Sequence, residues 1–169
     1  IVVIVGLLLV THTGYDQYFN GAQFIHFLLG PATVALAVPL IGQLSALKRN
    51  FIPISIALLV GALTGILSTV VLCRLLGMDG QTMLSLVPRS ITTPIAMGVS
   101  DQIGGSAELT VVFVVMTGVL GAAFGVPLLG RLARRDPIAS GFALGVTSHG
   151  IGTARAFEYS QTAGAFAGL

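Results

Sequence analysis

The sequence predicts an all-α integral membrane protein, built as a polytopic bundle of helices. Hydrophobic residues make up 54% of the 169 positions and charged residues only 8%, whereas a soluble domain carries about 25% charged residues. The mean hydropathy is +0.97. Two apolar stretches, 51–76 and 109–130, are each long enough to cross a hydrocarbon core of roughly 30 Å. Water cannot solvate a surface with so few charges, so we expect the chain to lie in lipid.

The charges and the cysteine count exclude several other classes of protein. The net charge of +2 comes from eight Lys/Arg against six Asp/Glu, and the basic residues sit in short clusters beside apolar stretches. Such clusters are typical of the cytoplasmic flanks of membrane helices and do not indicate nucleic-acid binding. Cys73 is the only cysteine, so we expect neither a disulfide framework nor a cysteine-based metal site.

The N-terminal part of the chain contains short elements. Residues 11–20, after an apolar run, are predicted to form an interfacial loop or a short helix. The apolar element 21–29 should stop at Gly30-Pro31, because proline lacks an N–H and clashes with the preceding turn. Residues 31–47 form the next element, which is closed by the basic residues Lys48 and Arg49.

We interpret residues 1–169 as a single transmembrane domain. The chain starts and stops inside apolar runs, so we expect further helices at both ends and interpret the domain as truncated there.

Glycines along the two long apolar stretches predict close helix packing. The first stretch has Pro53 in its first turn and the pair Gly61-x-x-x-Gly65, and it is followed by a turn at 78–80. The second stretch carries Gly118, Gly121 and Gly125 on nearby faces. Such glycines let a neighbouring membrane helix approach closely, and we assign them to packing and not to function.

Residues 81–105 are too polar for a lipid-facing helix and too rich in proline for a continuous one. Pro88 and Pro94 lie six residues apart. If the basic clusters at 48–49 and 131–135 both face the cytoplasm, the chain crosses the membrane an even number of times between them. The two long stretches supply those crossings, so we favour a re-entrant segment at 81–105 over a full span.

A second interruption is predicted near the C-terminus. Residues 137–147 should begin as a helix, with Asp136 as the N-cap and Pro137 at the first helical position. The helix should break at 148–153, and a second helical piece should begin near Ala154. The fold is therefore predicted to contain two discontinuous helices, broken or re-entrant, a pattern compatible with inverted repeats.

The two interruptions predict an anion site. Broken helices survive in a bilayer only where they are buried in protein or line water. Freed amides at the N-terminus of a half-helix favour negative charge, and an arginine beside them matches a carboxylate. The candidate substrate-binding residues are Arg89, Ser90, Thr92, Thr93, Ser148, His149, Gly150, Gly152, Thr153 and Arg155.

Structural explanations for the same residues stay open. Arg155 lies three residues before Glu158, so the two can form an internal ion pair, and Arg89 can extend to the membrane interface. His149 can bind freed carbonyl groups instead of substrate. Asp101 and Glu158 are candidates for coupling an ion, although the neighbourhood of Asp101 reads more readily as a membrane edge. No metal or cofactor is expected.

Two enzyme interpretations fail on the spacing of residues. The side chains of Ser148 and His149 diverge because the residues are adjacent, and no aspartate is placed to complete a triad. Gly150-x-Gly152 lacks the third glycine and the βαβ context of a dinucleotide site. We expect no catalytic residues and no enzyme.

Three blocks of sequence resemble the LrgB/CidB family. They are Leu29-Gly-Pro-Ala-Thr-Val-Ala-Leu-Ala-Val-Pro39, the block from Val87-Pro-Arg-Ser-Ile-Thr-Thr-Pro94 to Gly105, and Thr147-Ser-His-Gly-Ile-Gly-Thr-Ala-Arg-Ala156. The blocks occur in the order typical of the family, and the likeness extends over nearly the whole chain. It implies a multi-pass protein of the bacterial cytoplasmic (inner) membrane.

The resemblance implies two alternative functions. One is a holin/antiholin-like protein that regulates murein hydrolase activity and autolysis with a small membrane partner of the LrgA/CidA type. The other is a carrier of small monocarboxylates, such as glycolate or glycerate in the plant plastid relatives and pyruvate in bacterial relatives. The polar interruptions favour a carrier, because a holin needs a helix that oligomerises and no buried arginines. We expect a small organic anion, lipid, a separate LrgA/CidA-type partner and further copies of the chain as partners, and no nucleic acid.

Overall fold

The computed structural model describes residues 2–35, 37–132 and 136–169, and all regular secondary structure in these ranges is helical. The prediction of an all-α protein is therefore confirmed. The chain divides into two compact units, residues 1–38 and 39–169.

The first unit contains α1 (Val2–Val10) and α2 (Tyr15–Ala35), and α3 (Ala37–Ile41) begins at its end. The prediction that the helix stops at Gly30-Pro31 is wrong, since α2 continues through Pro31. Proline removes one N–H donor from a helix, and membrane helices tolerate that loss where other groups bond the freed carbonyl. Of residues 11–20, predicted as an interfacial loop or a short helix, 11–14 lie outside the helices and 15–20 form the start of α2.

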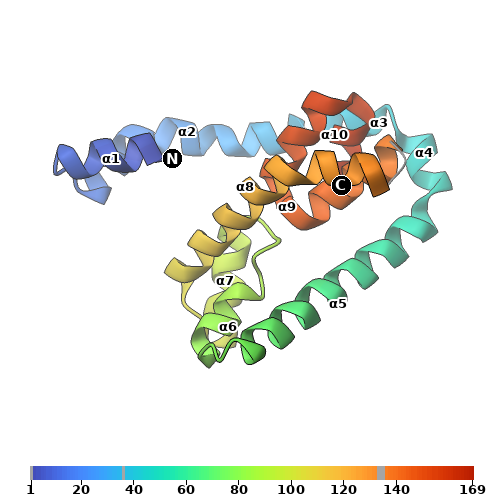
Figure 1. Ribbon diagram of the computed structural model, residues 1–169. Coiled ribbons are helices and arrows are strands. Elements are labelled where there is room, and N and C mark those ends of the chain that lie inside the picture. The colour runs from blue at the N-terminus through green and yellow to red at the C-terminus, as the bar shows by residue number, and fades with distance from the viewer. Residues whose placement is uncertain (1, 36, 133–135) are drawn as a thin grey trace. The chain divides into compact units, whose positions relative to one another are not determined.

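The second unit contains two long apolar helices, α5 (Phe51–Leu75) and α8 (Ala107–Leu132) (Figure 1). The short α4 (Leu44–Arg49) precedes α5, and two further short helices connect α5 to α8. Among the described residues, these two helices are long and apolar enough to cross a membrane, over Phe51–Leu75 and Ala107–Leu129. Only 11% and 17% of their most apolar windows are buried, unlike the core helix of a soluble protein. Both predicted spans are confirmed in position.

Two short helices connect α5 to α8. Helix α6 (Gly80–Leu86) begins at Asp79, whose carboxylate accepts a hydrogen bond from the backbone N–H of Thr82 at 2.9 Å. Residues 87–92 are not helical, and α7 (Thr93–Ile103) ends at Gly104 in the left-handed conformation, with φ of 88°. With 11 residues, α7 is about 16 Å long, too short to cross a bilayer.

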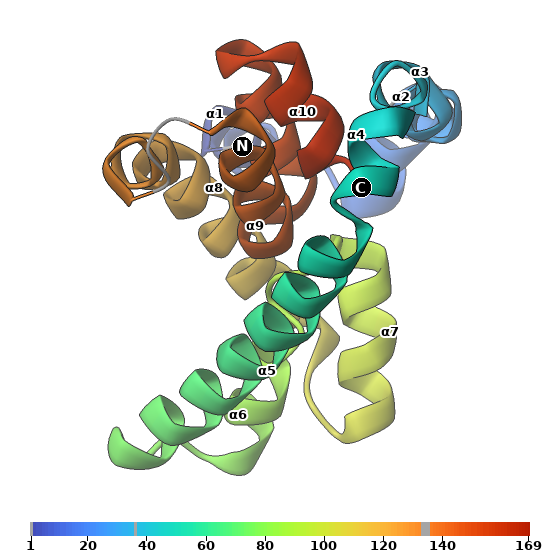
Figure 2. The ribbon, with the colours of Figure 1, turned by 90° about the vertical axis from the view of Figure 1, so that its right-hand side faces the viewer.

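The C-terminal part contains α9 (Pro137–Tyr159) and α10 (Gln161–Ala167), which lie side by side (Figure 2). Asp136 is the N-cap of α9, with its carboxylate 2.9 Å from the backbone N of Ile138, and Pro137 occupies the first turn, as predicted. The helix is interrupted at His149, where φ is 42° and ψ is −137°. The interruption is narrower than the predicted 148–153, because the chain is helical again from Gly150.

The backbone of α9 reverses direction at His149. A Cβ atom on Gly141 would lie 2.1 Å from the carbonyl O of Ala163, and one on Gly145 would lie 2.2 Å from that of Ala167. The first half of α9 therefore runs parallel to α10. The second half runs antiparallel to α10, because Phe157 packs on Gly164 and the Thr153 hydroxyl donates to the Ala167 carbonyl O at 3.0 Å. The two halves of α9 consequently form a hairpin.

Glycines of α8 bring this hairpin close, as predicted. A Cβ atom on Gly121 would lie 1.7 Å from the Ser148 hydroxyl, and one on Gly125 would lie 2.6 Å from Leu144. On α5 the described residues show no neighbour close enough to require glycine at either position of the pair. Gly61 lies in ordinary contact distance of Val146, whereas nothing lies within 4 Å of a Cβ atom on Gly65.

Candidate functional site

The first interruption holds Arg89 against α5. The guanidinium is half-buried, and its Nη1 donates to the Thr69 hydroxyl and, at 3.4 Å, to the carbonyl O of Leu86. An open pocket of about 300 Å³ lies beside it, and its only charged lining residue is Arg89. The lining residues are Thr69, Leu72, Cys73, Leu76, Met78, Leu86 and Arg89. Small-molecule sites in proteins have volumes from about 300 Å³ upward and a few placed polar groups.

The N-terminus of α7 follows directly after Arg89. Thr92 is the N-cap residue, but its side chain makes no capping hydrogen bond, and Pro94 in the first turn has no N–H. The backbone N–H groups of Thr93 and Ile95 therefore have no partner within the helix. Ser90 and Thr93 are half-buried and Thr92 is exposed. The segment thus combines a guanidinium with free donors at the positive end of a helix, which favours an anion.

His149 occupies the second interruption. Its Nε2 lies 3.1 Å from the backbone carbonyl O of Val114 on α8. Because a carbonyl oxygen only accepts, Nε2 carries the proton and donates it to Val114. In the neutral ring, Nδ1 is then the nitrogen that can accept a hydrogen bond. The ring fits because position 118 is glycine, where a Cβ atom would lie 2.8 Å from Nε2. A positive φ is unusual for a residue with a side chain, and such strain gathers at functional sites.

The other predicted residues of this interruption are used by the fold. Ser148 is fully buried against Gly121, with its hydroxyl 3.2 Å from that of Thr147. The Thr153 hydroxyl is shared between the carbonyl groups of His149 and Ala167, both at 3.0 Å. Gly152 packs on the backbone of Leu144, whereas Gly150 is exposed with open space around it.

Arg155 forms an ion pair with Glu158, one helical turn further on. The two side chains are 45% and 65% exposed. Asp101, the other predicted coupling residue, is also exposed, near the end of α7.

Helix α8 contacts α6 and α7 as well as His149 of α9. Thr110 on α8 contacts Ser85 of α6 and Ser100 of α7, and Val114 contacts His149. These two positions are one turn apart, about 6 Å along the axis. Across the described ranges, however, no hydrogen bond joins residues 87–94 to residues 148–155. The structure thus brings Ser85, Ser100 and His149 to one stretch of α8, without joining residues 87–94 and 148–155 in one cluster.

Thr69 and Cys73 are the site residues that sequence reasoning missed. Both are buried, on the face of α5 that meets Arg89. Their spacing of four places them on one face of the helix. Two polar side chains at this spacing within an apolar span were the available signal.

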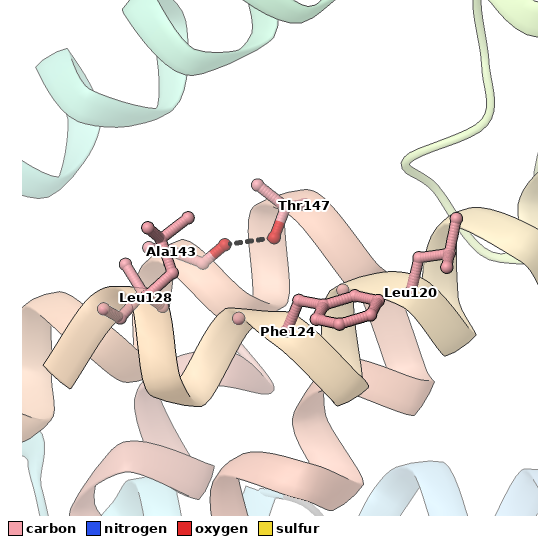
Figure 3. Close-up of a pocket in the computed structure, with 8 residues that line it drawn as sticks. Leu120, Phe124, Leu128, Ala143 and Thr147 are labelled. Carbon is pink, nitrogen blue, oxygen red and sulfur yellow. Dashed lines mark hydrogen bonds between the residues drawn. The ribbon is translucent and has the colours of Figure 1, made fainter.

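A second pocket, of about 240 Å³, lies between α8 and α9, and its lining is almost entirely apolar (Figure 3). Phe124, Leu120 and Leu128 line it, and its single hydroxyl, of Thr147, donates to the carbonyl O of Ala143 at 2.7 Å. It contains no charged group, so it is not suited to a small carboxylate.

Together these features describe a helical membrane protein with two reversals of the chain that pack on a common helix. The chain belongs to the LrgB-like family, whose model matches residues 1–169. The resemblance seen in the three sequence blocks is therefore confirmed.

Three relatives illustrate the similarity. The uncharacterized protein YwbG of Bacillus subtilis (strain 168) is 43% identical over 163 residues, which cover 96% of this chain and 72% of the relative. The uncharacterized protein YxaC of the same strain is 39% identical over 162 residues, covering 96% and 70%. The antiholin-like protein LrgB of Bacillus cereus (strain B4264) is 33% identical over 155 residues, covering 92% and 67%. No solved structure matches the chain.

Proposed function

We propose that the chain is a carrier of small monocarboxylates, of the pyruvate, glycolate or glycerate class, in the bacterial inner membrane. The observation that carries this proposal is Arg89, which lies half-buried at a chain interruption, beside an open pocket and the uncapped N-terminus of α7. A guanidinium within a bilayer costs at least about 2.5–3.5 kcal/mol on insertion scales, so its presence there calls for an anionic partner or a water-filled cavity.

The topology that we propose has two crossings and two re-entrant hairpins. Helices α5 and α8 would cross the membrane, the segment from α6 to α7 would enter from one side, and α9 would enter from the other. The contact of Ser85 with Ser106, at 2.7 Å, supports the first hairpin, because the chain enters and leaves at neighbouring points. The contact of His149 with Val114, in the first third of α8 and far from its Arg131 end, supports a deep tip for the second.

This topology agrees with the distribution of positive charge. Lys48 and Arg49 precede α5 and Arg131 lies at the end of α8, so both basic clusters would face the cytoplasm. Arg134 and Arg135 lie outside the described residues. A crossing helix followed by a hairpin then occurs twice in opposite orientation, which is the inverted repeat of many secondary carriers.

In the proposed mechanism, the substrate carboxylate binds Arg89 and the amides of Thr93 and Ile95. Ser90, Thr92 and Thr93 supply further hydroxyl donors at this end. From the other interruption, His149 and the amides at Gly150 and Gly152 would contact the substrate once the two hairpins approach. Ser148 and Thr153 would hold the second hairpin in shape. Arg155 would bind the anion at the mouth, and Glu158, its ion-pair partner, would be a candidate for coupling an ion.

Uptake of labelled pyruvate and glycolate into proteoliposomes tests the proposal. We expect uptake by the wild-type protein, and a loss of at least about tenfold in Arg89→Gln, because a charge-assisted hydrogen bond contributes about 1.5–3 kcal/mol. The matched control is Arg74→Gln, which removes an exposed arginine from the end of α5 outside the pocket. Unchanged uptake by Arg89→Gln would exclude this anion site.

The second candidate is an antiholin-like regulator of murein hydrolase activity and autolysis that acts with a separate LrgA/CidA-type membrane protein. The antiholin-like name of the Bacillus cereus relative supports this candidate more directly than it supports a carrier. Exposed apolar faces on α5 and α8, which can bind a partner or another copy of the chain, are compatible with it.

One experiment separates the two candidates. Melting of the purified protein in detergent is followed with and without a panel of two- and three-carbon acids. A carrier is stabilised by its substrate through mass action, whereas a regulator without a substrate is not. Stabilisation by pyruvate or glycolate that is lost in Arg89→Gln supports the carrier, and the absence of stabilisation by any acid supports the regulator.

A further inference from the structure

The pocket beside Arg89 has a polar end and an apolar wall. The polar end is the guanidinium together with the Thr69 hydroxyl, to which it is hydrogen-bonded. The wall consists of four apolar side chains, those of Leu72, Leu76, Met78 and Leu86. They come from the end of α5, from the turn that follows it and from α6. A small acid whose carboxylate binds Arg89 would have its remaining atoms beside this wall.

Thr69 fixes the orientation of the guanidinium. Its hydroxyl has one proton, which it donates to the carbonyl O of Gly65 at 2.7 Å. Toward Arg89 the hydroxyl oxygen therefore accepts, and it accepts from Nη1, which also donates to the carbonyl O of Leu86. The N–H groups of Nε and Nη2 have no hydrogen bond to the residues that the structure describes. This edge of a guanidinium matches one carboxylate through two parallel hydrogen bonds.

The pocket offers little to a hydroxyl group on the acid. The proton of Thr69 is already bound to Gly65, and the four wall side chains have no donor. The remaining polar side chain of the lining is Cys73, whose thiol is a weak donor. A substrate hydroxyl that loses water here without a new partner should lower the affinity by about five- to a hundredfold. A second carboxylate is less favourable still, because Arg89 is the only charged residue in the described lining.

An apolar tail gains affinity at the same wall. Each CH₂ group that is removed from water there raises the affinity by up to about fourfold. The volume of about 300 Å³ is at the low end for small-molecule sites, so it suits a short tail. The wall thus favours the acids that the polar end alone would not distinguish.

We infer that Leu72, Leu76, Met78 and Leu86 determine specificity, so that the site prefers short monocarboxylates with an apolar tail over hydroxy acids and dicarboxylates. This inference rests on the proposed carrier function, because it concerns the same site. Glycolate and glycerate are then the weaker ligands of the proposed class. Thr69 is a positioning residue, since it acts on the acid through the guanidinium.

The affinities of matched pairs of acids test the inference. They are obtained from the melting temperature of the purified full chain in detergent as a function of acid concentration. Propionate is glycolate with a methyl group in place of the hydroxyl, and 2-methylbutyrate is related to glycerate in the same way. The apolar acid of each pair should bind at least about fivefold more tightly, and succinate should bind more weakly than butyrate. Butyramide has the tail of butyrate without its charge and should not stabilise the protein.

Two variants make the wall polar with little change in size. Leu72→Asn and Met78→Gln should each reduce the preference for propionate over glycolate by about fourfold, the contribution of one CH₂ group. Leu75→Asn is the matched control, because it places the same side chain at an exposed position of α5 outside the pocket. It should keep the wild-type preference. If Leu72→Asn does not fold, Met78→Gln decides, because position 78 lies outside the helices.

A third variant separates orientation from selection. Thr69→Val should weaken the binding of propionate and glycolate by the same factor, and Thr69→Ser should restore both. Equal affinities within each pair of acids, or a wild-type preference in both Leu72→Asn and Met78→Gln, would overturn the inference and leave the carrier function in place. If no acid binds, the proposed function fails, and this inference fails with it.

Discussion

The two chain interruptions differ in how they use their polar groups. At the first, Arg89 is half-buried beside an open pocket, and the N-terminus of α7 has no side-chain cap. At the second, Ser148 and Thr153 are buried and hydrogen-bonded within the fold, and Arg155 is paired with Glu158 on an exposed face. The first therefore has donors available for a ligand. At the second, most polar side chains are bonded to other groups of the protein and stabilise the reversal of the chain.

The largest expected effect is a loss of stability caused by crowding the contact between α8 and the second interruption. Gly121→Ala places a Cβ atom on the buried Ser148 hydroxyl, and overpacking of this kind costs about 1–3 kcal/mol. The melting temperature in detergent, followed by far-ultraviolet circular dichroism, should fall. Gly65→Ala is the control, because that position is open, and alanine favours a helix by about 0.5–1 kcal/mol. Equal melting temperatures for the two variants would contradict the packing of α8 on α9.

A second prediction compares the two arginines. Uptake should fall further in Arg89→Gln than in Arg155→Gln, because solvent weakens the exposed pair of Arg155 with Glu158. The ratio of the two initial uptake rates measures the difference. A stronger loss in Arg155→Gln would move the anion site to the second interruption.

His149 allows strain and function to be separated. His149→Gly relieves a positive φ that costs about 1–3 kcal/mol and removes a hydrogen bond to Val114 that contributes about 1 kcal/mol. The two terms oppose each other, so the melting temperature should change little while uptake falls. A large loss of stability with normal uptake would assign His149 to the fold alone.

The smallest effect concerns the cap of α6. The hydroxyl and the backbone N–H of Thr82 donate to Asp79 and hold the pKa of that carboxyl below its ordinary value. A lowered pKa in the folded state contributes stability above the unfolded-state pKa, which is lost as the pH falls through the folded-state pKa. The difference in melting temperature between wild type and Asp79→Asn should therefore shrink in acid. A difference independent of pH would exclude the charge as its cause.

Composition and local chemistry predicted much of this fold. Length and apolarity placed α5 and α8 within a few residues, and the Asp136-Pro137 pair fixed the start of α9. These features depend on neighbours in the sequence. Pro31 misled the prediction because a proline disfavours a helix without forbidding it, and the surrounding residues of α2 remain helical.

The candidate site was less accessible, because its contacts join residues far apart in the chain. The sequence indicated Arg89 but neither its hydrogen-bond partner Thr69 nor Cys73 of the same pocket, both of which lie on α5. It also indicated polar residues at 148–153 without distinguishing those that pack, such as Gly152, from those that stay exposed, such as Gly150. Only the reversal at His149 decides which of them turn inward.

A single turn of α8 separates Thr110, which contacts α6 and α7, from Val114, which contacts His149. A ligand that shifted this segment on one side would also shift the contact on the other, and any coupling of two ligands through it would be mutual and equal in size. If a ligand at the first interruption raises the affinity for a ligand at the second by some factor, the second raises the affinity for the first by that same factor. This segment of α8 would thus link the binding of the two ligands.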